Sequence, residues 1–181
     1  VVLPRAGNIG GGGFMVIYLK DTDKSLTIDY REKAPAGAFR DLFLDSEGNY
    51  DKKKAQFSLL SAGVPGSVAG FHHALTKYGT ISWQKALEPA IRLAEEGFVI
   101  PHDLANTLAS KRYRARLSSD PAASKVFYKE DGSLFRAGEV LVQKDLAATL
   151  KLLSKNGPSA FYKGEIAKLI VQEMERNGGL I

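Results

Sequence analysis

The pattern of apolar and polar residues predicts two β-strands near the start of the chain. Residues 14–19 form a nearly continuous apolar run, which predicts a strand that is buried on both faces. Residues 26–31 alternate between apolar and polar side chains, which is the two-residue period of a second strand. The polar stretch 21–24 between them is typical of a turn, so the sequence predicts a β-hairpin.

Later in the chain the apolar residues recur at helical spacing. Ser67 and Ser82 stand where the N-caps of two helices are expected, and Gly79 and Gly97 stand where those helices would end. Pro89 would kink or split the second of these helices. The expected helices comprise residues 67–78, 83–96, 103–117, 143–156 and 159–177.

Strands and helices are unevenly distributed along the chain. Residues 7–31 hold a glycine turn and the hairpin, whereas residues 61–181 are mainly helical. The polar residues 45–56 are expected to form an exposed loop, and residues 126–135 a second, short hairpin. Because two strands alone do not make a stable sheet, residues 1–181 are expected to form a single partial domain of the α/β (α+β) class.

Composition narrows the class of protein only modestly. The chain has 181 residues, of which 44% are hydrophobic and 25% charged, as in an ordinary globular domain. It contains no cysteine, which excludes disulfides and thiolate chemistry. The net charge of +5 would attract anionic partners but does not specify a fold. The chain opens on Val1 without an initiator methionine or a signal peptide, so we expect a processed or shortened N-terminus.

Arg31 is the residue with the clearest potential for recognition. It ends the second predicted strand and is followed by a stiff turn that contains Pro35. Binding groups often lie at strand ends on rigid scaffolds. A guanidinium group offers a planar fork that matches a carboxylate with two parallel hydrogen bonds. From residue type alone, a structural ion pair of Arg31 with Asp29, Glu32 or another carboxylate is the more common role.

Other candidate motifs favour structural interpretations. The glycine run 7–13 precedes a strand and lacks the Gly-Lys-Ser/Thr sequence of a phosphate loop, so it predicts a tight packing turn and no nucleotide cofactor. His72 and His73 would point about 100° apart on one helix, and His102 is isolated, so no metal site is predicted. The basic stretch 111–116 could bind nucleic acid, but a solvated helix face explains it more simply.

Six sequence blocks follow one another in a specific order. They are GNIGGGGFMVIY (7–18), IDYREKAP (28–35), SAGVPGSVAGFHHALTKYGTISW (61–83), EPAIRLAEEGF (88–98), NGPSAFYKGEIA (156–167) and NGGLI (177–181). Together they resemble the N-terminal, large-subunit region of the γ-glutamyltranspeptidases, and the resemblance covers essentially the whole chain. The glycine-rich, Arg-Glu-x-Ala-Pro and Gly-x-Pro-Gly-x-x-x-Gly blocks are weak signals singly and highly specific together.

The resemblance implies an N-terminal-nucleophile hydrolase with a four-layer αββα sandwich. In that family the precursor cleaves itself into a large and a small subunit. The new N-terminal threonine of the small subunit attacks the γ-glutamyl amide of glutathione and related compounds. The γ-glutamyl group then passes to water, an amino acid or a peptide. The free α-amine can serve as the base of such a nucleophile, and backbone N–H groups stabilise the oxyanion.

The resemblance also gives Arg31 a role, because the arginine of the Arg-Glu-x-Ala-Pro block grips the α-carboxylate of the γ-glutamyl group. The catalytic threonine belongs to the small subunit, so no catalytic residue is expected in this chain and the chain alone should be inert. Its exposed hairpin should drive association with itself or with another part of its own protein. Family members are commonly periplasmic, secreted or on the outer cell surface.

Two alternatives remain open at the level of sequence. Cephalosporin acylases of the same superfamily share these large-subunit blocks, and the small subunit would distinguish them. The chain could also be a stand-alone module that uses Arg31 to bind an acidic small ligand such as glutamate or glutathione. A nucleic-acid partner through residues 111–116 and a membrane span are not expected.

Overall fold

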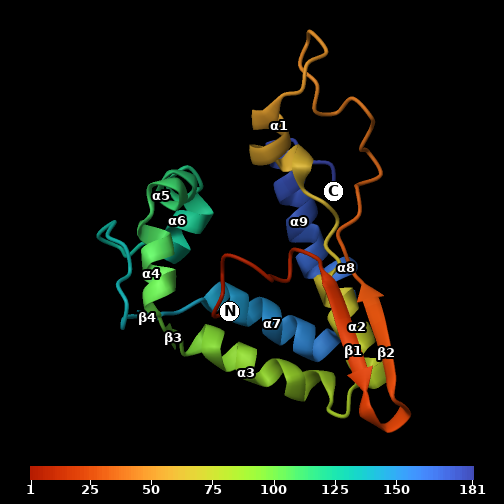
Figure 1. Ribbon diagram of the computed structural model, residues 1–181. Helices are drawn as coiled ribbons and strands as arrows, with labels where there is room; N and C mark the ends of the chain where they lie inside the picture. The colour runs from red at the N-terminus through yellow and green to blue at the C-terminus, as the bar shows by residue number, and fades with distance from the viewer. The chain divides into compact units, whose positions relative to one another are not determined.

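The computed structural model describes residues 1–181 and divides them into two compact units (Figure 1). We call residues 7–83 together with 156–181 the hairpin unit, and residues 1–6 together with 84–155 the helical unit. The mixture of helices and small antiparallel sheets confirms the predicted α/β class. None of the helices is both long and apolar enough to cross a lipid bilayer.

The hairpin unit contains the β-hairpin that the sequence predicts. Strands β1 (Phe14–Leu19) and β2 (Lys24–Asp29) pair antiparallel, in a register that sets Phe14 opposite Asp29. A 3-10 turn, η1 (Lys20–Thr22), joins them, and Asp23 adopts the left-handed conformation with a φ of 52°. Aspartate tolerates that conformation better than most residues do, which explains a polar turn at this position.

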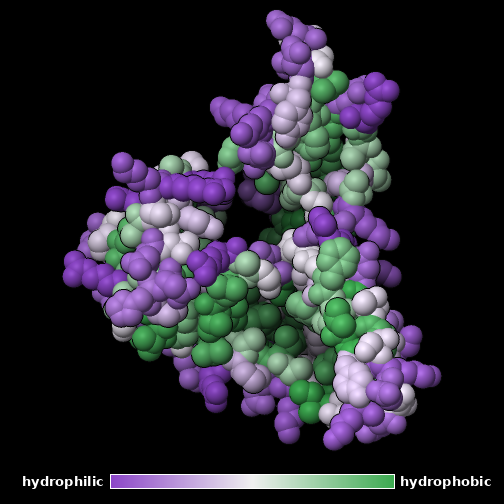
Figure 2. Space-filling model, viewed as in Figure 1, coloured by the Kyte–Doolittle hydropathy of each residue, from purple (hydrophilic) through white to green (hydrophobic).

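One face of the hairpin is covered and the other is open. β2 packs against α2 (Ser67–Tyr78). On the opposite face the side chains of Phe14, Val16 and Tyr18 are 63%, 76% and 60% exposed. Figure 2 shows apolar side chains at the surface where Figure 1 places β1. The prediction that residues 14–19 are buried on both faces is therefore wrong, because in this unit only one layer covers the two strands.

The rest of the hairpin unit contains four further helical elements. They are α1 (Lys52–Phe57), η2 (Leu59–Ser61), α8 (Ser159–Tyr162) and α9 (Glu165–Asn177). The helix expected over residues 159–177 is thus two helices, which meet at Lys163 and Gly164. α1 occupies part of the stretch 45–56 that was expected to be a loop, and Asp51 caps it by accepting a hydrogen bond from the Lys54 N–H.

The N-terminus of α2 differs from the sequence-based expectation. Gly66 is the N-cap, and Ser67, which was expected to cap the helix, is its first residue and is buried. Gly66 has no side chain to accept a hydrogen bond, so the first N–H groups of α2 need acceptors from other parts of the chain. The end of α2 at Gly79 is as predicted.

The helical unit has its own apolar core. Its elements are α3 (Trp83–Glu95), β3 (Phe98–Val99), α4 (His102–Ala109), α5 (Lys111–Ser118), α6 (Pro121–Phe127), β4 (Val140–Leu141) and α7 (Lys144–Asn156). The two-residue strands β3 and β4 pair antiparallel and were not predicted, because two residues carry no periodic pattern. The core consists of Phe98, Ile100, Leu104, Leu108 and Leu141.

Three expectations for the helical unit need correction. The helix expected over residues 103–117 is interrupted at Ser110, whose hydroxyl caps α5 by accepting a hydrogen bond from the Tyr113 N–H. The short hairpin expected over residues 126–135 is reduced to a single bridge between Tyr128 and Leu134, because α6 takes up its first residues. α3 runs through Pro89 without being split.

Candidate functional site

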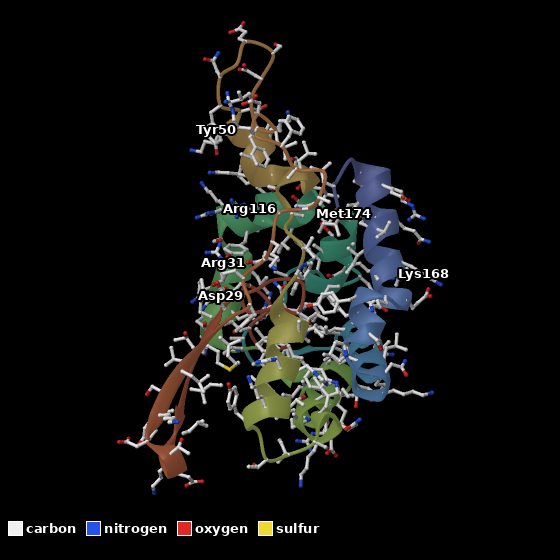
Figure 3. All side chains as sticks on the ribbon, turned by 90° about the vertical axis from the view of Figure 1, so that its right-hand side faces the viewer. Asp29, Arg31, Tyr50, Arg116, Lys168 and Met174 are labelled. Atoms are coloured by element: carbon white, nitrogen blue, oxygen red, sulfur yellow. The ribbon has the colours of Figure 1, made fainter.

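Arg31 lies just beyond the end of β2, at the end of the hairpin opposite its turn (Figure 3). The Asp29 side chain accepts a hydrogen bond of 2.9 Å from the Arg31 backbone N–H and so bends the chain where the strand stops. Tyr30 anchors the same stretch on α2, where its ring lies on Gly70 and meets the Phe71 ring edge-on at 5.5 Å. The sequence predicts a strand that ends on Arg31, whereas β2 ends two residues earlier, at Asp29.

The Arg31 side chain is largely free to meet a ligand. It is 64% exposed, with its Nε 3.6 Å from a carboxylate oxygen of Glu32 and its guanidinium carbon 5.7 Å from the centre of the Phe14 ring. Exposed ion pairs at this separation are weak, so the pair with Glu32 leaves the guanidinium fork available. The structural ion pair and the ligand-binding role are therefore compatible.

The backbone beneath Arg31 is held by close packing of three segments. The Gly11 carbonyl accepts hydrogen bonds of 2.9 Å from the N–H groups of both Gly66 and Ser67. A Cβ added at Gly12 would lie 2.6 Å from the Tyr30 carbonyl oxygen, and one added at Gly66 would overlap the same oxygen. The glycine run therefore serves as the tight packing turn that the sequence predicts.

A short backbone pairing completes this support. Lys33 donates its N–H to the Val64 carbonyl at 3.2 Å, and Val64 donates its N–H to the Lys33 carbonyl at 2.8 Å. Residues 30–33 are thus joined on one side to the glycine run and on the other to residues 64–66. Because Arg31 itself makes only loose side-chain contacts, its position depends on this backbone arrangement.

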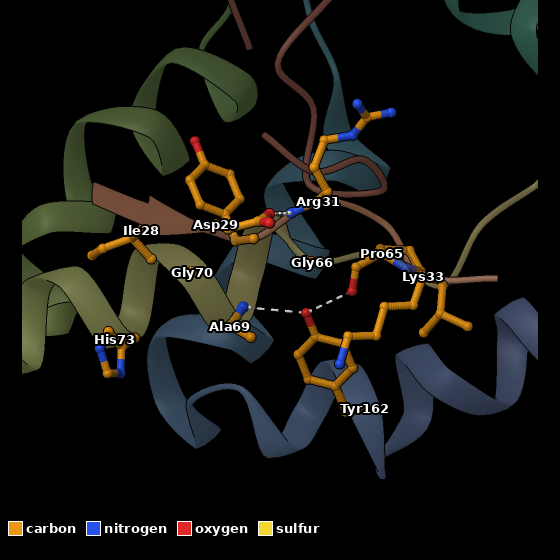
Figure 4. Close-up of a pocket in the computed structure, with 12 residues that line it drawn as sticks. Ile28, Asp29, Arg31, Lys33, Pro65, Gly66, Ala69, Gly70, His73 and Tyr162 are labelled. Atoms are coloured by element: carbon orange, nitrogen blue, oxygen red, sulfur yellow. Dashed lines mark hydrogen bonds between the residues drawn. The ribbon is translucent and has the colours of Figure 1, made fainter. Parts of the chain in front are cut away.

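A pocket of about 420 Å³ lies beside the turn (Figure 4). Its polar lining includes Asp29, Arg31, Lys33, His73 and Tyr162. In Figure 4 the Arg31 side chain extends away from Tyr162, whereas the Lys33 side chain reaches toward it. The lining contains no serine, threonine or cysteine, so the pocket offers groups for recognition and not a nucleophile of these types.

Tyr162 joins the walls of the pocket. Its hydroxyl donates a hydrogen bond of 2.9 Å to the Pro65 carbonyl and accepts one of 3.2 Å from the Ala69 N–H. The Tyr162 hydroxyl is protonated and able to donate at neutral pH, as an ordinary phenol is, and burial raises its pKa further. Sequence reasoning missed both Tyr162 and Lys33, since nothing in the local pattern around either residue indicates a long-range contact.

The other residues considered at the level of sequence lie apart from this arrangement or serve packing. His72 stacks edge-on against Trp83 with 5.2 Å between ring centres, whereas His73 lines the pocket. His102 is the first residue of α4 in the helical unit. The basic stretch 111–116 lies on α5, where its lysine and arginine side chains are exposed.

Comparison with known proteins places the whole chain in one family. The family model described as "Gamma-glutamyltranspeptidase" matches residues 1–181. The chain is 48% identical over 181 residues to the "Glutathione hydrolase proenzyme" of Escherichia coli (strain K12), and 41% identical over 180 residues to that of Bacillus subtilis (strain 168). It covers 31% and 30% of these two relatives, so it spans about a third of their length.

Solved structures agree with this assignment. The gamma-glutamyltranspeptidase of Helicobacter pylori superimposes with a TM-score of 0.94 at 44% identity, covering 100% of this chain and 51% of that chain. The gamma-glutamyltranspeptidase of Pseudomonas nitroreducens complexed with L-DON gives a TM-score of 0.88 at 36% identity, with the same coverage of 100% and 51%. On the match of the family model over its full length, this chain belongs to the gamma-glutamyltranspeptidase family.

Proposed function

We propose that this chain is the N-terminal part of the large subunit of a γ-glutamyltransferase that also acts as a glutathione hydrolase. The observation that carries the proposal is the exposed guanidinium group of Arg31 on a backbone held by glycine packing. The relatives named glutathione hydrolase proenzymes, of which the chain covers about a third, support it. Arg31 is the proposed anchor for the α-carboxylate of the γ-glutamyl group.

The chemistry would be completed by the remainder of the precursor. After self-cleavage, the N-terminal threonine of the small subunit attacks the γ-carbonyl carbon, and its own α-amine takes the hydroxyl proton. Backbone N–H groups stabilise the oxyanion, the amide nitrogen leaves with a proton, and the γ-glutamyl ester remains on the threonine. Water, an amino acid or a peptide then accepts the γ-glutamyl group. In this scheme Arg31 orients the substrate and excludes acyl groups without an α-carboxylate.

The open face of the hairpin supports the αββα sandwich as the complete fold. Phe14, Val16 and Tyr18 form an apolar row that a second layer of the complete protein would cover. As the sequence predicts, we also propose that residues 1–181 form a single partial domain of the large subunit. Alone, the chain should be inert and should associate through this face. A periplasmic or secreted location follows from the family and is also a proposal.

The role of Arg31 can be tested in the complete, processed enzyme. Arg31→Ala should lower kcat/KM for a γ-glutamyl anilide by about 10- to 100-fold, the loss expected for hydrogen bonds to a charged group. For the matching anilide that lacks the α-carboxylate, Arg31→Ala should change little. Arg40→Ala is the matched control, since Arg40 is 92% exposed and forms its ion pair with its neighbour Asp41.

The alternative function is that of a binding module for an acidic small ligand. The observation in its favour is that two cationic side chains, Arg31 and Lys33, line the same pocket. Calorimetry of the 181-residue chain with glutamate or glutathione separates the two functions. Millimolar or tighter binding that Arg31→Ala abolishes would support the module. Equal loss of activity toward both anilides on Arg31→Ala would instead refute the anchor role.

A further inference from the structure

We propose that Tyr162 is a positioning residue for Arg31, acting through the Pro65–Gly66 turn. This inference rests on the proposed role of Arg31 as carboxylate anchor. Tyr162 is the last residue of α8 and lies 93 residues after Ala69 and 97 residues after Pro65 in the chain. All of these residues belong to the hairpin unit. The two hydrogen bonds of the Tyr162 hydroxyl link α8 to the Pro65–Gly66 turn and to the first turn of α2 (Figure 4).

The Tyr162 hydroxyl takes the place of a missing helix cap. α2 begins after Gly66, which has no side chain, so the N–H groups of its first turn lack a local acceptor. The Gly11 carbonyl accepts from Gly66 and Ser67, and Tyr162 accepts from Ala69. Glycine is required at the cap because any side chain there would overlap the Tyr30 carbonyl oxygen. A cap supplied from another segment of the chain resolves this conflict.

The same hydroxyl fixes the turn against the backbone of Arg31. Tyr162 donates a hydrogen bond to the Pro65 carbonyl. Pro65 lies between Val64, which pairs with Lys33, and Gly66, which packs on Tyr30. Displacement of residues 64–66 would therefore displace residues 30–33. The Arg31 side chain has only a loose ion pair and a ring contact of its own, so such a shift would move the guanidinium group directly.

The chemistry of the phenol suits this role. A protonated hydroxyl can donate one hydrogen bond while it accepts another, and Tyr162 does both. A phenol is protonated at neutral pH, and burial raises the pKa of the Tyr162 hydroxyl further above its ordinary value. The Phe161 ring, which is buried, meets the Tyr162 ring edge-on at 5.1 Å and helps to hold it. Phenylalanine at position 162 would keep the ring and remove both hydrogen bonds.

The test is a double-mutant cycle in the complete, processed enzyme, with steady-state kinetics on a γ-glutamyl anilide. Tyr162→Phe should raise KM about 3- to 10-fold, which corresponds to one or two lost hydrogen bonds, and should leave kcat nearly unchanged. In an Arg31→Ala background, or Arg31→Lys where activity is too low, Tyr162→Phe should no longer raise KM. Tyr128→Phe is the control, because the Tyr128 hydroxyl donates to the Arg114 carbonyl in the helical unit.

The outcomes distinguish a failure of the anchor role of Arg31 from a failure of the positioning role of Tyr162. If Arg31→Ala leaves KM unchanged, the anchor role itself fails. If Arg31→Ala raises KM but Tyr162→Phe does not, or raises it equally in both backgrounds, only the positioning role of Tyr162 is overturned. A second measurement needs no activity: hydrogen exchange of the Ala69 amide should speed up several-fold in Tyr162→Phe. Unchanged exchange at Ala69 would refute the capping bond and with it the proposal.

Discussion

Replacing Gly66 by alanine tests whether close packing positions the turn that carries Arg31. The added Cβ would overlap the Tyr30 carbonyl oxygen and would lie 2.8 Å from the Tyr30 carbonyl carbon and 3.1 Å from the Arg31 carbonyl oxygen. Non-bonded carbon atoms prefer a separation of about 3.5–4.0 Å, so one backbone would have to move by about 1 Å. Gly66 has a φ of −108°, which any residue adopts, so the penalty would come from contact alone.

The expected change in the free energy of unfolding combines a destabilising contribution and a smaller stabilising one. Forcing extra atoms into a well-packed site costs about 1–3 kcal/mol of the free energy of unfolding. Replacing glycine reduces the freedom of the unfolded chain and offsets about 0.4–1 kcal/mol of that cost. Alanine is also a poorer N-cap than glycine, which adds a small further loss. Gly66→Ala should therefore lower the free energy of unfolding by about 1–2 kcal/mol.

Urea unfolding followed by tryptophan fluorescence measures this change. Trp83 is the single tryptophan of the chain. It is the first residue of α3 but belongs to the hairpin unit, where it stacks against His72, so its emission reports on that unit. Gly10→Ala is the matched control, because a Cβ there would meet only the side-chain oxygen of Asn8, at 3.3 Å. Equal stability of the two variants would refute the reasoning, since it would show that residues 30–31 and 66 can separate freely.

Two further predictions follow from the open hairpin face and from Tyr162. Val16→Lys should weaken self-association of the isolated chain in sedimentation velocity, because Val16 is 76% exposed on the apolar row of the hairpin. Ile81→Lys changes a 48% exposed residue outside the hairpin and should leave self-association unchanged. Equal effects of the two substitutions would contradict association through the open face of the hairpin. Because the pKa of Tyr162 is raised, the folded chain holds the phenolic proton more tightly than the unfolded chain does. Below the ordinary pKa of 10.0, this group should not change the free energy of unfolding with pH. As the pH rises further, the free energy of unfolding should fall. Tyr162→Phe should make that fall shallower in urea titrations from about pH 8 to about pH 11, and parallel pH profiles for the two proteins would count against the shift.

Where the sequence predicted the fold well, the determining interactions are local. The hairpin at residues 14–29 follows from apolar runs around a polar turn, and the end of α2 follows from Gly79. Where a prediction from the sequence was wrong, another interaction outweighed the local pattern on which the prediction rested. The helix expected over residues 103–117 breaks at Ser110, whose hydroxyl prefers to cap the following helix. The serine expected to cap α2 lies inside it, because Gly66 is the residue that fits against Tyr30.

In the candidate site too, some residues could be predicted from local sequence and others could not. Arg31 could be singled out from the sequence because a strand ends there, arginine is suited to carboxylates, and the surrounding block resembles a known family. Two other residues that line its pocket, Lys33 and Tyr162, could not be found in this way. Their relevance comes from contacts with residues 64–69 that no sequence period encodes.

The sequence by itself determined the family, the hairpin and most helix positions, because turns, caps and periodicity act over a few neighbouring residues. Only the tertiary structure decided which face of β1 is open, since burial depends on how many layers cover a strand and not on its apolar content. The tertiary structure also decided that a hydroxyl at position 162 caps a helix that begins at Ser67. A hydrogen bond between residues more than ninety positions apart exists only after packing has brought its donor and acceptor together.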